Sequence, residues 1–110
     1  MNQPTGNLTK GILAGAAGTG SLVTLYTGGK RGAEDLVLYV ANIAATAKTF
    51  RVQVVNAAAT VTTYLAYDVS VAPNSLPIEL DIPCLRQGDL VKFLGSDANV
   101  YGTLFGSGSE

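Results

Sequence analysis

Cys84 is the residue in this 110-residue chain whose type comes closest to covalent chemistry. A thiol nucleophile needs a base beside it, and the usual base is absent because the chain contains no histidine. As the single cysteine, Cys84 has no partner for an intramolecular disulfide and cannot form a cysteine-rich metal site. We therefore expect Cys84 to be a small buried apolar residue.

Glu79 and Asp81 are the nearest approach to a catalytic pair of carboxylates. Their spacing places both side chains on one face of a strand. A general-acid pair sits in a cleft where one carboxyl group is desolvated, whereas the outward face of a strand leaves both groups in water. We interpret these acids as solvated charges that also discourage pairing of their strand with other chains.

The sequence GGKRG, residues 28–32, has the glycines and the lysine of a phosphate-binding loop without its spacing. That motif needs an earlier glycine and a Ser or Thr directly after the lysine, and these positions hold Thr24 and Arg31. Lys30 and Arg31 are better interpreted as solvated loop charges that can pair with acidic groups on a partner. With no catalytic motif in the chain, we expect no enzyme, no cofactor and no metal site.

The composition limits the possible partners. Apolar residues make up 47% of the chain and charged residues only 14%, so some apolar surface is expected to contact other proteins. The net charge of −1, without clusters of either sign, argues against binding to nucleic acid. No apolar run reaches the length of about 18 residues that a transmembrane helix needs. Residues 10–21 imitate a signal peptide, but their apolar core is short and broken by glycines.

The clearest structural signal is the segment 49–73, which contains two runs of alternating apolar and polar residues separated by a turn of small residues. This alternation predicts a β-hairpin with one buried face. The inward residues of this hairpin, expected to form the middle of the core, are Phe50, Val52, Val54, Leu65, Tyr67 and Val69.

The rest of the chain continues the pattern of short strands and turns. Further strands are predicted at residues 21–27, 34–43, 76–82, 89–95 and 100–105. Pro77 places the strand 76–82 at a sheet edge, because proline cannot donate to a ladder. The predicted fold is all-β: one antiparallel sandwich or jelly-roll-like barrel of seven to eight strands over residues 21–106, with a flexible tail at 107–110.

The predicted strand 34–43 is apolar on both faces from Leu36 to Ala41. A strand without a wet face is covered on both sides, here by the core and by a loop, the N-terminal arm or another subunit. Leu36 and Leu38 are therefore candidate partner contacts. Tyr64 on the outward face of the hairpin is another, since tyrosine offers a large area with a polar tip, although it can also lie on its own sheet.

Residues 1–20 are predicted to form a flexible, glycine-rich arm and not a packed element. Only Leu8, Ile12 and Leu13 offer bulk to bury. Two interpretations stay open: an arm that crosses onto a neighbouring subunit with Ile12 and Leu13 as anchors, or a frayed terminus.

The order of these pieces is also informative: an apolar strand ending at Asn42, a hairpin ending in SVAPNS, the strand LPIELDI, and QGDLVKF before a short turn and a last strand. Over residues 22–105 this order resembles the small β-sandwich virion proteins of tailed bacteriophages. The resemblance implies a capsid decoration or cement protein that binds the outside of the virion shell and stabilises it. Its partners would be the major capsid protein and copies of itself, as a homo-oligomer such as a trimer.

Two alternatives stay open beside this expectation. A phage tail, baseplate or fibre module would share the fold. A carbohydrate-binding module would need exposed aromatic side chains on a concave face, and the absence of Trp disfavours it.

Overall fold

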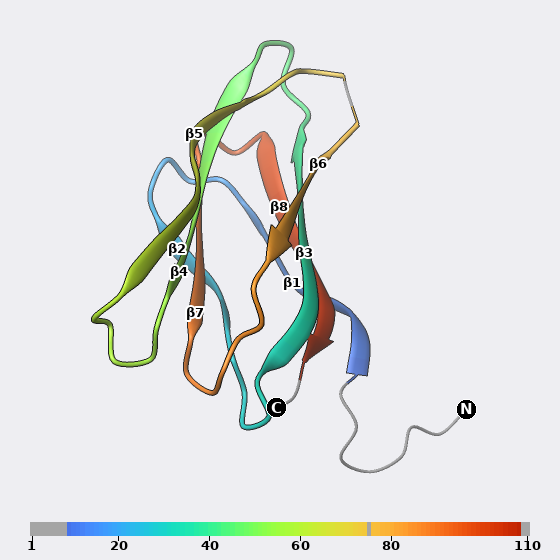
Figure 1. Cartoon of the computed structure of the whole chain (residues 1–110). Helices are drawn as coiled ribbons and strands as arrows, with labels where there is room; N and C mark the ends of the chain where they lie inside the picture. The colour runs from blue at the N-terminus through green and yellow to red at the C-terminus, as the bar shows by residue number, and fades with distance from the viewer. Residues whose placement is uncertain (1–8, 75, 109–110) are drawn as a thin grey trace.

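The computed structural model describes residues 9–74 and 76–108, which form eight strands in two four-stranded antiparallel sheets (Figure 1). The strands are β1 (Thr9–Ala17), β2 (Val23–Thr27), β3 (Ala33–Asn42), β4 (Lys48–Val55), β5 (Thr62–Val71), β6 (Ile78–Ile82), β7 (Leu90–Gly95) and β8 (Val100–Gly108). The prediction of an all-β sandwich is confirmed.

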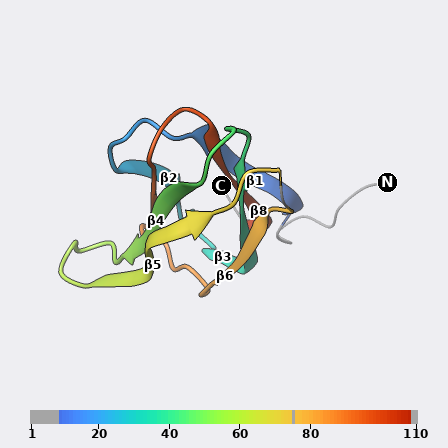
Figure 2. The same ribbon diagram turned by 90° about the horizontal axis from the view of Figure 1, so that it is seen from above.

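The strand order is that of a jelly roll. One sheet, which we call sheet A, has the order β1-β8-β3-β6, and the other, sheet B, has the order β2-β7-β4-β5. Every connection between consecutive strands passes from one sheet to the other except the β4–β5 hairpin, which Figure 2 shows extending away from the body of the sandwich. The predicted hairpin is confirmed, and β6 lies at the edge of sheet A as Pro77 indicated.

The core lies between the sheets and is built from the inward residues of both. Its largest fully buried side chains are Phe50, Phe93, Leu38, Leu104, Val40, Val52, Val71, Val91 and Val100. Each such side chain contributes about 1.5–3 kcal/mol to folding by leaving water. Leu36 and Leu38 are only 3% and 0% exposed, so their prediction as partner contacts is wrong. They share the inward side of β3 with Val40, and the outer face belongs to the alternate residues.

The predicted inward face of β5 is only partly correct, because its pairing with β4 shifts register twice, between Phe50 and Val52 and between Val52 and Gln53. Phe50 pairs with Val69 and Val52 pairs with Ala66, so Tyr67 and Asp68 together oppose the single residue Arg51. The extra residue of this bulge shifts the alternation. Ala66 and Val71 are therefore buried, whereas Tyr67 is 58% exposed and Val69 is 38% exposed.

The N-terminal segment differs from the prediction. Residues 9–17 form β1, which pairs with β8 from Thr9↔Gly108 to Ala17↔Tyr101. Leu13 packs against the core, so this part of the chain is not an unpacked arm. The carboxyl end differs as well, because β8 continues through Ser107 and Gly108. Residues 1–8 and 109–110, the rest of the predicted arm and tail, lie outside the described residues.

Cys84 is exposed, so the prediction of a buried thiol is wrong. The neighbouring residue takes the buried place instead: Leu85 is in the core and bonds Ala33 through both backbone groups, N to O at 2.8 Å and O to N at 2.9 Å. Since adjacent residues of an extended chain point to opposite sides, Cys84 faces outward.

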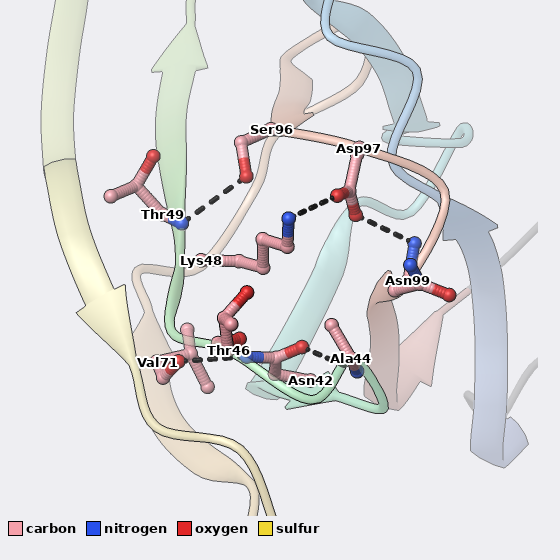
Figure 3. Close-up of polar contacts among 9 residues, drawn as sticks. All are labelled: Asn42, Ala44, Thr46, Lys48, Thr49, Val71, Ser96, Asp97 and Asn99. Atoms are coloured by element: carbon pink, nitrogen blue, oxygen red, sulfur yellow. Dashed lines mark hydrogen bonds and ion pairs between the residues drawn. The ribbon is translucent and has the colours of Figure 1, made fainter.

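The end of β3 is fixed by the buried side chain of Asn42 (Figure 3). Its Nδ2 donates to the carbonyl oxygens of Thr46 and Val71, both at 2.9 Å, and its Oδ1 accepts from the backbone N–H of Ala44 at 2.8 Å. Asn42 therefore ties the end of β3 in sheet A and the β3–β4 turn to the last residue of β5 in sheet B.

Candidate interaction surfaces

The outer face of sheet A is an apolar surface that runs across three of its four strands. Directly opposite residues of antiparallel strands point to the same side, so the pairing defines rows of outward side chains. The rows are Ile12–Phe105–Val37–Asp81, Gly15–Thr103–Tyr39–Glu79 and Ala17–Tyr101–Ala41. Apolar and small residues occupy β1, β8 and β3, while acids occupy β6. A surface of this composition is typical of a protein contact.

This face contains a hollow of about 570 Å³, which we call the sheet A hollow. It is lined by Gly11, Asp35, Val37, Tyr39, Ala41, Pro77, Tyr101, Thr103, Phe105 and Gly106. Tyr39 and Phe105 pack edge to face there, with ring centroids 5.2 Å apart and planes at 75°. This geometry is a favourable one for aromatic pairs and gives the hollow a firm apolar wall.

The margin of the hollow is acidic. Asp35 lines it directly, and Glu79 and Asp81 project from β6 in the outward rows. A hydrogen bond from the Tyr39 hydroxyl to Glu79, together with the negative charge of that carboxylate, raises the pKa of Tyr39. None of the described lining residues is basic, and the charged residue among them is Asp35.

A second surface lies on the outer side of sheet B and is built by Arg51, Tyr64, Tyr67 and Asp68, which we call the tyrosine cluster. The Arg51 guanidinium carbon lies 4.1 Å from the centroid of the Tyr67 ring. Its Nε and Nη2 donate to the two carboxylate oxygens of Asp68, at 2.6 and 3.1 Å. Tyr64 packs edge to face with Tyr67, with ring centroids 5.7 Å apart. Both tyrosines stay well exposed.

The bulge in β5 creates this arrangement. It turns Tyr67 out of the core and places Asp68 at a φ of 53°, a left-handed conformation that few residues other than glycine adopt readily. The paired charges then stabilise each other: the hydrogen bond from Arg51 lowers the pKa of Asp68, and the same bond raises the pKa of Arg51. Bulges often re-aim side chains at functional positions.

The residues predicted from sequence as partner contacts are not brought together. Ile12 is 69% exposed on the outer face of sheet A, whereas Leu13 turns toward the core. Lys30 and Arg31 are exposed in the loop between β2 and β3 and line neither surface. Tyr64 belongs to the tyrosine cluster.

Several residues of these surfaces were not predicted, chiefly Val37, Tyr39, Phe105 and Arg51. The signal for Val37 and Tyr39 was present, because they are the alternate residues of the strand that is apolar on both faces. The error was to choose Leu36 and Leu38 as the outward residues of this strand. Arg51 carried no signal of its own, since Tyr67 and Asp68 both oppose it only because of the bulge in β5.

Two further kinds of feature, a metal-ion site and a membrane-spanning helix, are not found among the described residues. Across residues 9–74 and 76–108, no group of three or more His, Cys, Asp or Glu side chains is placed to hold a metal ion. The same part of the chain has no helix long and apolar enough to cross a membrane.

Comparison with known proteins does not identify a relative: no family model matches this chain, and no curated protein or solved structure matches it.

Proposed function

We propose that this chain is a structural virion protein that binds the outside of a phage capsid as a decoration protein and stabilises the shell. The observation that carries the proposal is the outer face of sheet A, where an apolar surface spans three adjacent strands around the sheet A hollow. In this role the face is buried against protein, either the major capsid protein or a neighbouring copy of the chain.

The fold and the resemblance support the same role. Eight-stranded jelly rolls are a common architecture of viral capsid proteins, although lectin domains and other proteins use them as well. The order of turns and strands over residues 22–105 resembles phage virion proteins in particular. The inner face of sheet A already packs on the core, so an apolar outer face is expected where another protein covers it in an assembly.

Co-sedimentation with empty capsid shells that lack the protein tests this proposal. Wild-type protein is expected to sediment with the shells, and Thr103→Arg, which fills the centre of the sheet A hollow with a charged side chain, is expected to bind at least about tenfold more weakly. Thr46→Arg, which adds the same side chain at an exposed turn, is the matched control and should bind like wild type. Wild-type protein that stays in the supernatant would count decisively against the proposal.

Immunogold labelling of intact virions tests the location. Gold over the head is expected. Gold confined to the tail or fibres would contradict the capsid location and indicate a tail or fibre protein.

A further inference from the structure

The outer face of sheet A and the tyrosine cluster have complementary properties, and they belong to one chain. The first is a concave apolar surface with an acidic margin. The second is an exposed pair of aromatic side chains with the cation Arg51 beside it. Interface anchors are typically Tyr, Trp or Arg side chains that enter an apolar pocket on the partner.

We propose that the sheet A hollow binds the tyrosine cluster of a second copy of this chain, so that copies associate head to tail. The proposal rests on the proposed function in one respect, since it takes the outer face of sheet A to be a protein contact. It goes further by naming the occupant of the hollow and the residues that enter it.

Charge favours this occupant over a second hollow. Asp35 lines the hollow, Glu79 and Asp81 lie on the edge strand β6, and none of the described lining residues is basic, so two hollows packed together would bring no cation from their linings to these acids. Sheet B offers the cation Lys92, whereas the charge of Arg51 is matched within the cluster by Asp68. Lys92 lies in the same row as Tyr64, because Gln53 pairs with both of them. The head-to-tail contact therefore places the charge of Lys92 at the acidic margin.

The cluster is also already ordered for binding. Arg51 is fixed by two hydrogen bonds to Asp68 and lies over Tyr67, which packs against Tyr64. Little side-chain freedom remains to be lost on association. The same contacts weigh against a sugar ligand, because Arg51 occupies one face of the Tyr67 ring and the edge-to-face pair occupies a further ring face. Sugars need such faces for stacking.

The two surfaces lie on different sides of the molecule, because they are the outer sides of the two opposed sheets (Figure 2). A contact between two different surfaces is heterologous. A chain of copies joined in this way has a free hollow at one end and a free cluster at the other. Further copies can add until the two ends meet and a ring closes. A ring of three copies is one such closed form.

Sedimentation equilibrium with two variants tests the proposal. Tyr64→Ser/Tyr67→Ser removes the cluster, and Thr103→Arg blocks the hollow with a side chain that also repels Arg51 and Lys92. Wild-type protein is expected to self-associate, and each variant alone is expected to do so at least about 25-fold more weakly. An equimolar mixture of the two should form a dimer that grows no further, because only one intact hollow and one intact cluster can meet. Ile43→Ser and Thr46→Arg are the controls for loss of an exposed apolar side chain and gain of a charge.

Three results would overturn the proposal. Wild-type protein that stays monomeric while still binding capsid shells would leave the proposed function in place and remove this inference. Self-association of the double tyrosine variant at wild-type strength would show a symmetric contact that does not use the cluster. Binding of wild-type protein to a glycan array that is lost in the double tyrosine variant would make the cluster a sugar site.

Discussion

At the scale of single residues, Asn42 makes three hydrogen bonds, two within the β3–β4 turn and one to Val71 in the opposite sheet. It is buried, and its amide satisfies the carbonyl oxygens of Thr46 and Val71 and the backbone N–H of Ala44. A buried backbone group that loses its hydrogen-bond partner destabilises the fold, because its desolvation penalty is no longer offset by a hydrogen bond.

Asn42→Ala should therefore lower the free energy of unfolding by about 1–3 kcal/mol, as measured by urea denaturation. Asn99→Ala is the matched control, because Asn99 is exposed, and its effect should stay within about 0.5 kcal/mol. Equal effects of the two substitutions would contradict the role given to Asn42.

Asp68 gives a prediction about pH. Its pKa is lowered in the folded chain, chiefly by the hydrogen bond from Arg51. A lowered folded-state pKa means that the carboxylate contributes stability above its ordinary value of 3.8 and loses that contribution as the pH falls through the folded value. Part of the acid sensitivity of the chain below about pH 4 should therefore come from this residue.

Asp68→Asn should make the melting temperature fall less steeply in this acidic range, and thermal scans between neutral and acidic pH measure it. Asparagine tolerates the left-handed backbone of position 68, so the bulge is kept. In an Arg51→Gln background, Asp68→Asn should no longer change the slope. A slope change that persists without Arg51 would show that another group is responsible.

At the scale of elements, β1 is the strand that could not be predicted from the sequence. Five of the first 20 residues are glycine and few are bulky, which is the composition of a linker. The strand forms because β8 offers a complete partner edge, and the register shift between Ile12 and Ala14 lets Leu13 reach the core. Pairing with a distant segment, rather than local preference, therefore decides the structure here.

The neighbours Ile12 and Leu13 provide a matched test of this strand. Leu13→Ala should lower the free energy of unfolding by about 1–3 kcal/mol, because it removes a side chain packed on the core. Ile12→Ala should change it by less than about 0.5 kcal/mol, because Ile12 is exposed. Negligible effects of both substitutions, measured by urea denaturation, would indicate an unpacked arm.

The elements also show how far the sequence could be interpreted. The hairpin of β4 and β5 and the edge position of β6 could be predicted because alternation and Pro77 are local signals. The exposure of Tyr67 could not, since the bulge that turns it outward is defined by pairing with β4. The inward side of β3 was ambiguous, because a strand that is apolar on both faces does not reveal which face meets the core.

At the scale of the whole molecule, the jelly roll arranges two unlike surfaces on opposite sides of one core. The outer face of sheet A is apolar with an acidic margin, and the outer face of sheet B carries the tyrosine cluster with Arg51 and Lys92. A chain with this polarity is suited to assembly, both on another protein and with its own copies. The two contacts can be separated experimentally, because shell binding and self-association have different readouts.

The central claim is that the outer face of sheet A is buried against protein on the surface of a capsid. A cryo-electron microscopy map of the parent particle measures this most directly. It should show the chain on the exterior of the shell, with Val37, Thr103 and Phe105 in contact with another protein chain. A particle without the chain on its head, or a chain whose sheet A outer face is open to solvent in every copy, would contradict the claim.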